Sequence, residues 1–234
     1  MSDSNCYWAV VPAAGVGKRM AADRPKQYLR LGQKTVIEHT LDRLIESMVF
    51  KRVIVALSLD DPYWPTLSYA SSAGVIRVPG GKERADSVLS ALDFLLTIAG
   101  ENDWVLVHDA ARPCLQVKDI HGLIDSVKHD SMGGILALPL HDTLKNVSDE
   151  HISDTVDRTT IWRALTPQMF RLKSLRDALK TALVQGLVVT DEASAIELQG
   201  GRPRIVEACP DNIKITRPED LPLAGFYLEQ QNCE

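Results

Sequence analysis

Residues 7–20 read YWAVVPAAGVGKRM, a short apolar run that changes abruptly into a loop rich in glycine and cations. The run from Tyr7 to Val11 predicts a buried strand, and the proline, alanine and glycine residues that follow predict a loop. This stretch therefore sets the first strand of the fold and places a chemically unusual loop at its carboxyl end.

Apolar runs and helical periodicities alternate along the rest of the chain. Further strands are predicted at 53–57, 75–78, 104–107, 135–138 and 204–208, and helices at 36–45, 88–96, 117–128, 172–185, 191–199 and after Pro218. Strands that alternate with amphipathic helices form a sheet covered on both faces. We predict an α/β fold with a Rossmann-like, mainly parallel twisted sheet.

Residues 141–160 are polar and charged and contain only short alternating pieces, so they do not resemble core. A long loop inside a compact domain is usually functional or disordered. We predict a projecting β-hairpin arm that contacts a partner subunit; the alternative is a solvated surface loop. The chain shows no internal repeat, and we predict one domain over residues 1–234.

The composition is that of an ordinary globular protein, with 45% hydrophobic and 24% charged residues. A formal net charge of −5 argues against a nucleic-acid or anionic-membrane partner, because both need a basic face. The longest apolar runs fall far short of the roughly 20 residues of a membrane span. The N-terminus also lacks the pattern of a secretion signal.

The cysteines and histidines show none of the spacings that hold metals in zinc sites. The four cysteines are scattered without a CxxC pair, which is typical of reduced thiols and predicts a cytoplasmic protein. None of the six histidines joins a serine or cysteine in a nucleophile motif. His108, at the end of a predicted strand, is expected to be packed rather than catalytic.

The first loop concentrates cations in an otherwise acidic protein, with Lys18, Arg19, Arg24 and Lys26 around Gly15 and Gly17. Glycines let backbone N–H groups approach an anion, and cations neutralise it, so phosphate is the expected ligand. A Walker A loop would need glycine in place of Pro12 and serine or threonine in place of Arg19. A dinucleotide fingerprint would need glycine or alanine in place of Met20. Both motifs fit poorly.

Two more unusual loops follow strands, GGKER at 80–84 and HDAARP at 108–113. Because ligands bind at the carboxyl ends of parallel strands, these loops are expected to share one edge with the first. Asp109 suits a hard cation such as Mg²⁺ held against phosphate, although a turn or capping role is equally consistent with its position. Arg112 is expected to hold an anion or to pair with Asp109.

The segment after the last predicted strand offers another cation, Lys214. Thr216 and Glu219 have the spacing of a capping box for the closing helix, so Thr216 is expected to be structural. A phosphate monoester is already largely dianionic at neutral pH, its second pKa being about 6, and it attacks without a general base. Lysine, arginine and Mg²⁺ would therefore be sufficient for phosphoryl chemistry here.

Seven stretches in order resemble the 2-C-methyl-D-erythritol 4-phosphate cytidylyltransferase family over essentially the whole chain. They are PAAGVGKRM with RPKQY, GGKERADSV, VHDAARP, TVDR, ALTPQ, TDEASA and NIKITRPEDL. The resemblance implies that CTP and methylerythritol phosphate are converted into a CDP-alcohol and pyrophosphate, in a homodimer that exchanges a hairpin arm.

The resemblance also implies a role for individual residues. Arg19, Lys26 and Lys214 would stabilise the transition state, and Asp109 would bind Mg²⁺. The nucleotide would be held by Pro12, Ala13, Ala14, Gly15, Gly17, Lys18, Gly81, Ser87 and Ala110. The sugar phosphate would be surrounded by Arg112, Thr143, Thr166, Thr190 and Lys214, and by Arg158 of the neighbouring subunit. Lys82 departs from relatives that carry an acid there.

Some of these residues also have structural interpretations. Ser87 suits a helix-surface or capping hydroxyl, and Thr190 suits a helix N-cap beside Asp191. Three other functions remain open: a cytidylyltransferase for another polyol phosphate such as ribitol 5-phosphate, a non-catalytic nucleotide-binding regulator, and a dehydrogenase that uses the glycine loop for NAD. We expect no second enzyme domain after Glu234.

Overall fold

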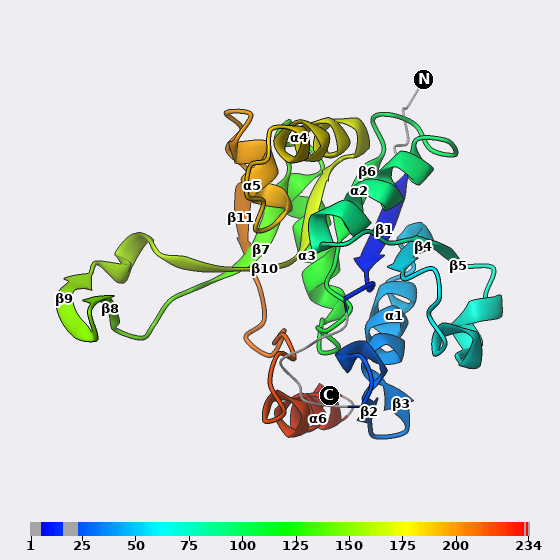
Figure 1. Cartoon of the computed structure of the whole chain (residues 1–234), viewed down its shortest axis with the longest axis horizontal. Coiled ribbons are helices and arrows are strands. Elements are labelled where there is room, and N and C mark those ends of the chain that lie inside the picture. Colours follow the sequence, from blue (N-terminus) through cyan, green and yellow to red (C-terminus); the bar gives the residue numbers. More distant parts are fainter. Residues whose placement is uncertain (1–5, 16–22, 232, 234) are drawn as a thin grey trace.

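A computed structural model describes residues 6–15, 23–231 and 233. Its centre is a seven-stranded sheet in the order β11-β7-β10-β6-β1-β4-β5 (Figure 1). The strands are β1 (Tyr7–Pro12), β4 (Phe50–Leu57), β5 (Val75–Pro79), β6 (Trp104–Val107), β7 (Gly134–Pro139), β10 (Trp162–Arg171) and β11 (Arg204–Glu207). The helices are α1 (Val36–Glu46), α2 (Arg84–Leu95), α3 (Val117–Val127), α4 (Leu172–Val184), α5 (Glu192–Glu197) and α6 (Asp220–Gln231). The predicted α/β fold is confirmed.

β10 is antiparallel to both of its neighbours, β6 and β7, whereas the other pairs in the sheet are parallel. The sequence analysis assigned no strand to this segment. Proline is rare in central strands because it removes a ladder hydrogen bond. Pro167 lies in this strand after a cis peptide bond, and the register against β7 shifts between Ala164 and Gln168.

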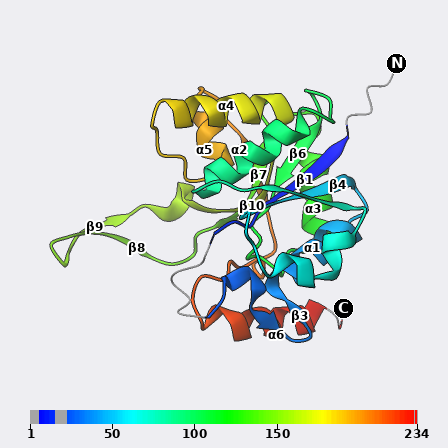
Figure 2. The same ribbon diagram turned by 45° about the vertical axis from the view of Figure 1, so that its right-hand side comes forward.

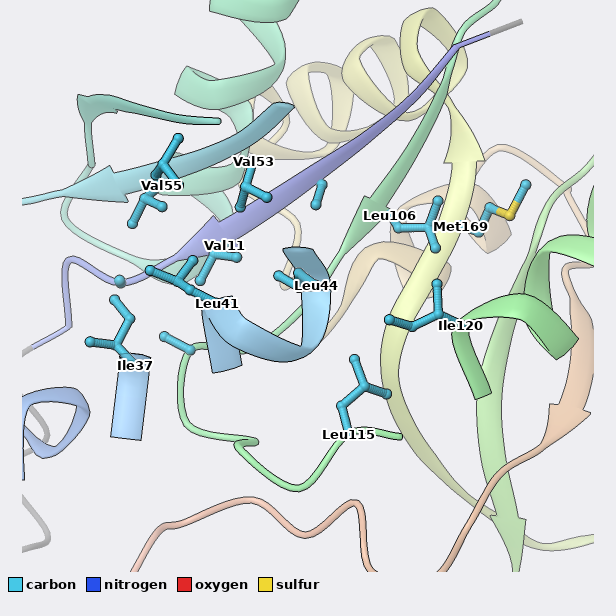
Figure 3. Packing of buried hydrophobic residues seen from close by; sticks show 14 of the residues in the cluster. Val11, Ile37, Leu41, Leu44, Val53, Val55, Leu106, Leu115, Ile120 and Met169 are labelled. Atoms are coloured by element: carbon cyan, nitrogen blue, oxygen red, sulfur yellow. The ribbon is translucent and has the colours of Figure 1, made fainter. Parts of the chain in front are cut away.

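Helices cover both faces of the sheet (Figure 2). One cluster of buried side chains joins α1 and α3 to Ala9, Val11 and neighbouring strand residues (Figure 3). The other joins α2, α4 and α5 to Trp8 and Val10. Successive residues of β1 thus enter opposite cores, as the two-residue period of a strand requires, which explains why β1 is apolar throughout.

A third cluster fixes the C-terminal segment near the carboxyl edge of the sheet. α6 contributes Ala224 and Leu228, which pack with Leu31 of β2 (Arg30–Leu31), Val36 and Ile215. β2 pairs with β3 (Lys34–Thr35) in a short hairpin. The segment that carries Lys214 is therefore held between the main domain and α6.

Residues 141–160 form the predicted projecting hairpin (Figures 1 and 2). Its strands, β8 (Leu144–Ser148) and β9 (His151–Val156), pair in an antiparallel two-stranded sheet separate from the main sheet. Val147 and Ile152 are 63% and 64% exposed there. The hairpin thus presents apolar side chains that no described element of the chain covers.

The short 3-10 helices are η2 (Lys26–Tyr28), η3 (Trp64–Thr66), η4 (Ser68–Ser71) and η5 (Arg158–Thr160). Within the described residues, no helix combines the length and apolar character needed to cross a membrane.

Candidate active site

The carboxyl ends of β1, β5 and β6 meet around a cleft of about 340 Å³. Its lining includes Pro12, Ala13, Ala14, Gly15, Gly81, Ser87 and Ala110, all of which were predicted to bind nucleotide. Lys26 and Lys214 line the same cleft. Gly17, Lys18 and Arg19 were also predicted at this site and lie outside the described residues. The three loops therefore share one edge, as expected for parallel strands.

Gln27 holds the first loop in place through hydrogen bonds to its backbone, a role that was not predicted from the sequence. The side chain is buried, and its amide donates to the carbonyls of Ala13 at 2.8 Å and Gly15 at 3.0 Å. Lys26, next to it, donates to the carbonyl of Ile215 at 2.8 Å. Arg24 forms an ion pair with Asp23 at 2.9 Å. Of the cations described in this segment, Arg24 is paired with Asp23 and Lys26 lines the cleft.

The second loop approaches the first closely because its first two residues, Gly80 and Gly81, have no side chains. A Cβ on Gly80 would lie 2.5 Å from Ala14 Cβ, and one on Gly81 would overlap Asp86 Cβ. Ser87 is buried, and its hydroxyl accepts from Gly81 N at 3.0 Å and donates to Glu83 O at 3.1 Å. Ser87 therefore fixes the glycine loop, and the helix-surface interpretation is wrong.

Gly81→Ala is expected to lower kcat/KM for the nucleotide substrate by about 10- to 100-fold, because the loop must shift away from Asp86 and small misplacements are costly in transfer sites. Steady-state kinetics with the nucleotide varied would measure this. Gly74→Ala is the matched control, since a Cβ there meets only Ser72 Oγ at 3.6 Å. Equal kinetics in the two variants would contradict the interpretation.

Asp109 follows β6 and is the centre of the charged network. Oδ1 accepts from Arg84 Nε at 2.9 Å, and Oδ2 accepts from Lys214 Nζ at 2.9 Å and Arg112 Nε at 3.3 Å. Burial alone would raise the pKa of this carboxyl, but Arg84, Lys214 and Arg112 together hold it well below its usual value. Asp109 is therefore an anion, and the turn or capping role is not its main one.

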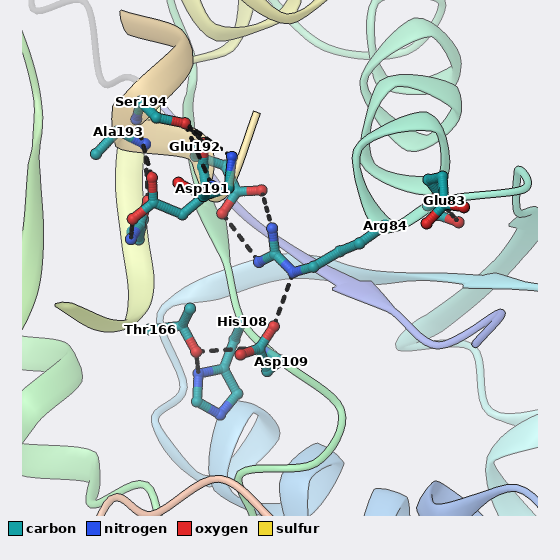
Figure 4. Close-up of polar contacts among 12 residues, drawn as sticks. Glu83, Arg84, His108, Asp109, Thr166, Asp191, Glu192, Ala193 and Ser194 are labelled. Atoms are coloured by element: carbon teal, nitrogen blue, oxygen red, sulfur yellow. Dashed lines mark hydrogen bonds and ion pairs between the residues drawn. The ribbon is translucent and has the colours of Figure 1, made fainter. Parts of the chain in front are cut away.

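Arg84 is the main functional candidate that the sequence analysis missed. It is the first residue of α2, and besides Asp109 it contacts Glu192, the first residue of α5 (Figure 4). The two terminal guanidinium nitrogens donate to Glu192 Oε1 at 2.7 Å and Oε2 at 3.0 Å. Both residues lie in stretches that carry the family resemblance, GGKERADSV and TDEASA, which was the available signal.

His108 and Thr166 fix the backbone of Asp109 from behind. His108 is fully buried, as expected, and its Nε2 lies 3.1 Å from the carbonyl of Arg112, so this nitrogen carries the proton. Its Nδ1 then accepts from Thr166 Oγ1 at 3.0 Å, and Thr166 Oγ1 accepts from Asp109 N at 3.1 Å. Burial lowers the pKa of His108 to about 4, consistent with a neutral imidazole.

A second cavity of about 270 Å³ adjoins the first. Its lining includes four predicted substrate ligands, Arg112, Thr166, Thr190 and Lys214. Arg84, Asp109 and Lys214 line both cavities. This shared set of charged groups separates two compartments, which is the arrangement that a transfer reaction between two bound substrates requires.

Thr143 and Arg158 line neither of these two cavities. Thr143 is exposed near the base of the hairpin, and Arg158 donates to the carbonyl of His141 there. A single chain therefore does not bring these two predicted substrate ligands to the cavities.

Two capping predictions are wrong in detail. The side chain of Asp191, rather than Thr190, caps α5 by accepting from Ser194 N at 2.9 Å. Asp220, rather than Glu219, accepts from Thr216 N at 2.7 Å and Thr216 Oγ1 at 2.9 Å. In each case the capping residue lies one position later in the sequence than predicted, because the helix begins later than the spacing pattern suggested.

The described residues include no group of three or more His, Cys, Asp or Glu side chains suited to a metal. Mg²⁺ is commonly held by one or two carboxylates together with substrate phosphates rather than by a protein cage. Asp109, a deprotonated carboxylate in the wall of the nucleotide-sized cleft, fits such a shared site.

A mainly parallel sheet whose carboxyl edge combines a glycine-lined cleft, lysines and a second cavity defines the chain as a nucleotidyltransferase by class. The profile of the 2-C-methyl-D-erythritol 4-phosphate cytidylyltransferase family matches residues 7–230. The chain belongs to this family, and the resemblance inferred from the sequence is confirmed.

Individual relatives agree over nearly their whole length. The 2-C-methyl-D-erythritol 4-phosphate cytidylyltransferase of Vibrio vulnificus (strain YJ016) is 55% identical to this chain, and the alignment covers 95% of this chain and 94% of the Vibrio protein. That from Ectopseudomonas mendocina (strain ymp) is 56% identical, with coverage of 93% and 94%. A crystal structure of the Francisella tularensis enzyme aligns with a TM-score of 0.83 at 37% identity, covering 95% of this chain and 99% of that one.

Proposed function

We propose that this enzyme transfers CMP from CTP to 2-C-methyl-D-erythritol 4-phosphate and releases 4-diphosphocytidyl-2-C-methyl-D-erythritol and pyrophosphate. The observation that carries the proposal is the shared lining: Arg84, Asp109 and Lys214 face both cavities. One cavity then holds the nucleotide and the other the sugar phosphate. The reacting phosphates meet between them.

The reaction is a substitution at the α-phosphorus of CTP. A phosphate oxygen of the sugar phosphate forms the new P–O bond, and the bond to the bridging oxygen breaks as pyrophosphate leaves with its electron pair. The attacking oxygen is already deprotonated, since the second pKa of a phosphate monoester is about 6. The protein therefore supplies alignment and positive charge, and needs no general base.

Lys26 and Lys214, which both line the cleft, supply that charge, and we assign Arg19 to the same task. The backbone of residues 12–15 and 81, with Ser87, forms a narrow site that suits a pyrimidine; Gly17, Lys18 and Ala110 complete the nucleotide set. Arg112, Thr166 and Thr190 bind the sugar phosphate in the second cavity.

We further propose that Mg²⁺ enters with the triphosphate and that Asp109 is its protein ligand. The cation would neutralise phosphate charge during transfer. Asp109 accepts from Arg84, Arg112 and Lys214, so a bound cation would share this carboxylate with them. Chelation should abolish turnover, and added Mg²⁺ should restore it.

Pyrophosphate release from CTP with a panel of polyol phosphates tests the function. Methylerythritol phosphate should give the highest kcat/KM, and the other nucleoside triphosphates should be poor donors. A preference for ribitol 5-phosphate would overturn the substrate but leave the mechanism. CTP binding without turnover of any polyol phosphate would support the regulator instead.

The hairpin supports the proposal of a homodimer that exchanges arms. It projects from the domain, exposes Val147 and Ile152, and carries two predicted substrate ligands away from the cavities of its own chain. Arg158 would then reach the second cavity of the partner. The four free thiols are consistent with our proposal of a cytoplasmic enzyme.

Mixed dimers would reveal the sharing. An Arg158→Ala chain paired with a Lys26→Ala chain has one complete site if Arg158 acts across the interface, and none if it acts within its own chain. A 1:1 mixture should regain about a quarter of wild-type activity at limiting sugar phosphate, because half of the dimers are mixed and each has one intact site. Each variant alone is the control, and the absence of any regain would contradict arm exchange.

A further inference from the structure

Glu192 is a buried carboxylate whose side chain, among the described residues, forms hydrogen bonds with Arg84. Its side chain is 1% exposed, and its two carboxylate oxygens accept hydrogen bonds from the two terminal guanidinium nitrogens of Arg84. The remaining nitrogen of the same guanidinium, Nε, donates to Asp109 Oδ1 (Figure 4). Arg84 thus joins the start of α5 to the end of β6.

The position of Glu192 is set independently of Arg84. The helix that carries it is capped by Asp191, and the N–H of Ala193 donates to the buried Gln168 Oε1 at 2.8 Å. Gln168 belongs to β10, and its amide also donates to Asp191 Oδ2 at 2.9 Å. The carboxylate is therefore a fixed anchor, and the long arginine adapts to it.

We propose that Glu192 is a positioning residue for the transfer: it holds Arg84 so that only Nε reaches Asp109, which leaves Asp109 Oδ2 to orient Lys214. The proposal rests on the proposed function. Glu192 does not line either cavity, whereas Arg84 lines both, so the effect passes through Arg84.

The physical reason is the fork geometry of arginine. A guanidinium free to turn offers two parallel N–H groups to a carboxylate, which is its preferred bidentate contact. Without Glu192, Arg84 would take both oxygens of Asp109 or would reach for phosphate in the cleft. In the first case Lys214 loses its 2.9 Å contact with Asp109 Oδ2 and its fixed place beside the reacting phosphates, and in the second Asp109 loses the Arg84 contact at Oδ1 that helps to hold it.

A buried ion pair can also be merely structural, so the experiment must separate position from stability. We suggest Glu192→Gln, Arg84→Gln and the double variant, with kcat, KM for both substrates and thermal unfolding measured on each. Asp103→Asn is the matched control. Asp103 accepts from Trp8 Nε1 at 2.9 Å and Cys6 N at 3.1 Å at the opposite edge of the sheet.

Glu192→Gln should lower kcat by about 10- to 100-fold. KM for CTP should change by less than about threefold, because binding of the nucleotide in the ground state is retained. Adding Glu192→Gln to Arg84→Gln should change kcat no further, since Arg84 carries the effect. Asp103→Asn should lower the melting temperature without lowering kcat in the folded protein.

Near-wild-type kcat in folded Glu192→Gln would overturn the proposal, and so would a double variant in which the two losses multiply. If the single variant fails to fold, the double variant, which leaves no unpaired buried charge, is compared with Arg84→Gln. Failure of the proposed function would appear separately, as a wild-type enzyme that does not turn over methylerythritol phosphate.

Discussion

Lys214→Ala is expected to lower kcat by about 10²- to 10³-fold, the cost of removing one group that stabilises charge in the transition state. Its ammonium lies 2.9 Å from Asp109 and lines both cavities, which is where the two phosphates would meet under the proposed function. The loss should appear in kcat and in kcat/KM, because the interaction is strongest in the transition state.

Lys128→Ala is the matched control for this substitution. Lys128 forms an ion pair with Asp125 at 2.7 Å, and its side chain is 39% exposed, close to the 37% of Lys214. Single-turnover kinetics at saturating CTP would isolate the chemical step. Near-normal turnover in Lys214→Ala would remove this lysine from the catalytic set.

Lys26→Ala is expected to cost a similar factor, about 10²- to 10³-fold, through the triphosphate side of the reaction. Lys26 follows the first loop, lines the cleft in which we propose that CTP binds, and donates to the carbonyl of Ile215, beside Lys214. Its charge would offset that of the departing pyrophosphate. KM for CTP should rise as well, because the same charge binds the ground-state triphosphate.

Lys34→Ala serves as the control for Lys26. Lys34 lies in the neighbouring short hairpin and pairs with Asp42 at 2.7 Å on the surface. Kinetics with CTP varied at saturating sugar phosphate would measure both parameters. A Lys26→Ala enzyme with unchanged kcat would show that the cation only assists binding.

Much of the fold was predictable from residue patterns. The apolar runs gave β1, β4, β5, β6, β7 and β11 to within a few residues. The reason is clearest for β1 and β6, which are almost wholly buried and have few polar positions. The helical spacings gave six helices with similar accuracy. β10 was missed because Pro167, between Thr166 and Gln168, interrupts the apolar residues that would have indicated a central strand.

The sequence predicted which residues belong to the candidate site but not which of them contact one another. Asp109, Lys214 and Ser87 were expected from their loops, and the structure brings them to one cleft. Glu192 could not be predicted as the partner of Arg84, because 108 residues separate them and no local pattern records such a contact. The roles assigned to individual residues stay predictions for the kinetics above.

The stretch YWAVVPAAGVGKRM and the motifs after it determined by themselves the fold class, the family and the loops that carry the chemistry. Local patterns suffice for this, since strand periodicity and loop composition are properties of neighbouring residues. Only the tertiary structure decided that Arg84, Asp109 and Lys214 form the boundary between two cavities. That boundary depends on tertiary contacts, because Arg84 from the segment after β5 and Lys214 from the segment after β11 both reach Asp109, which follows β6.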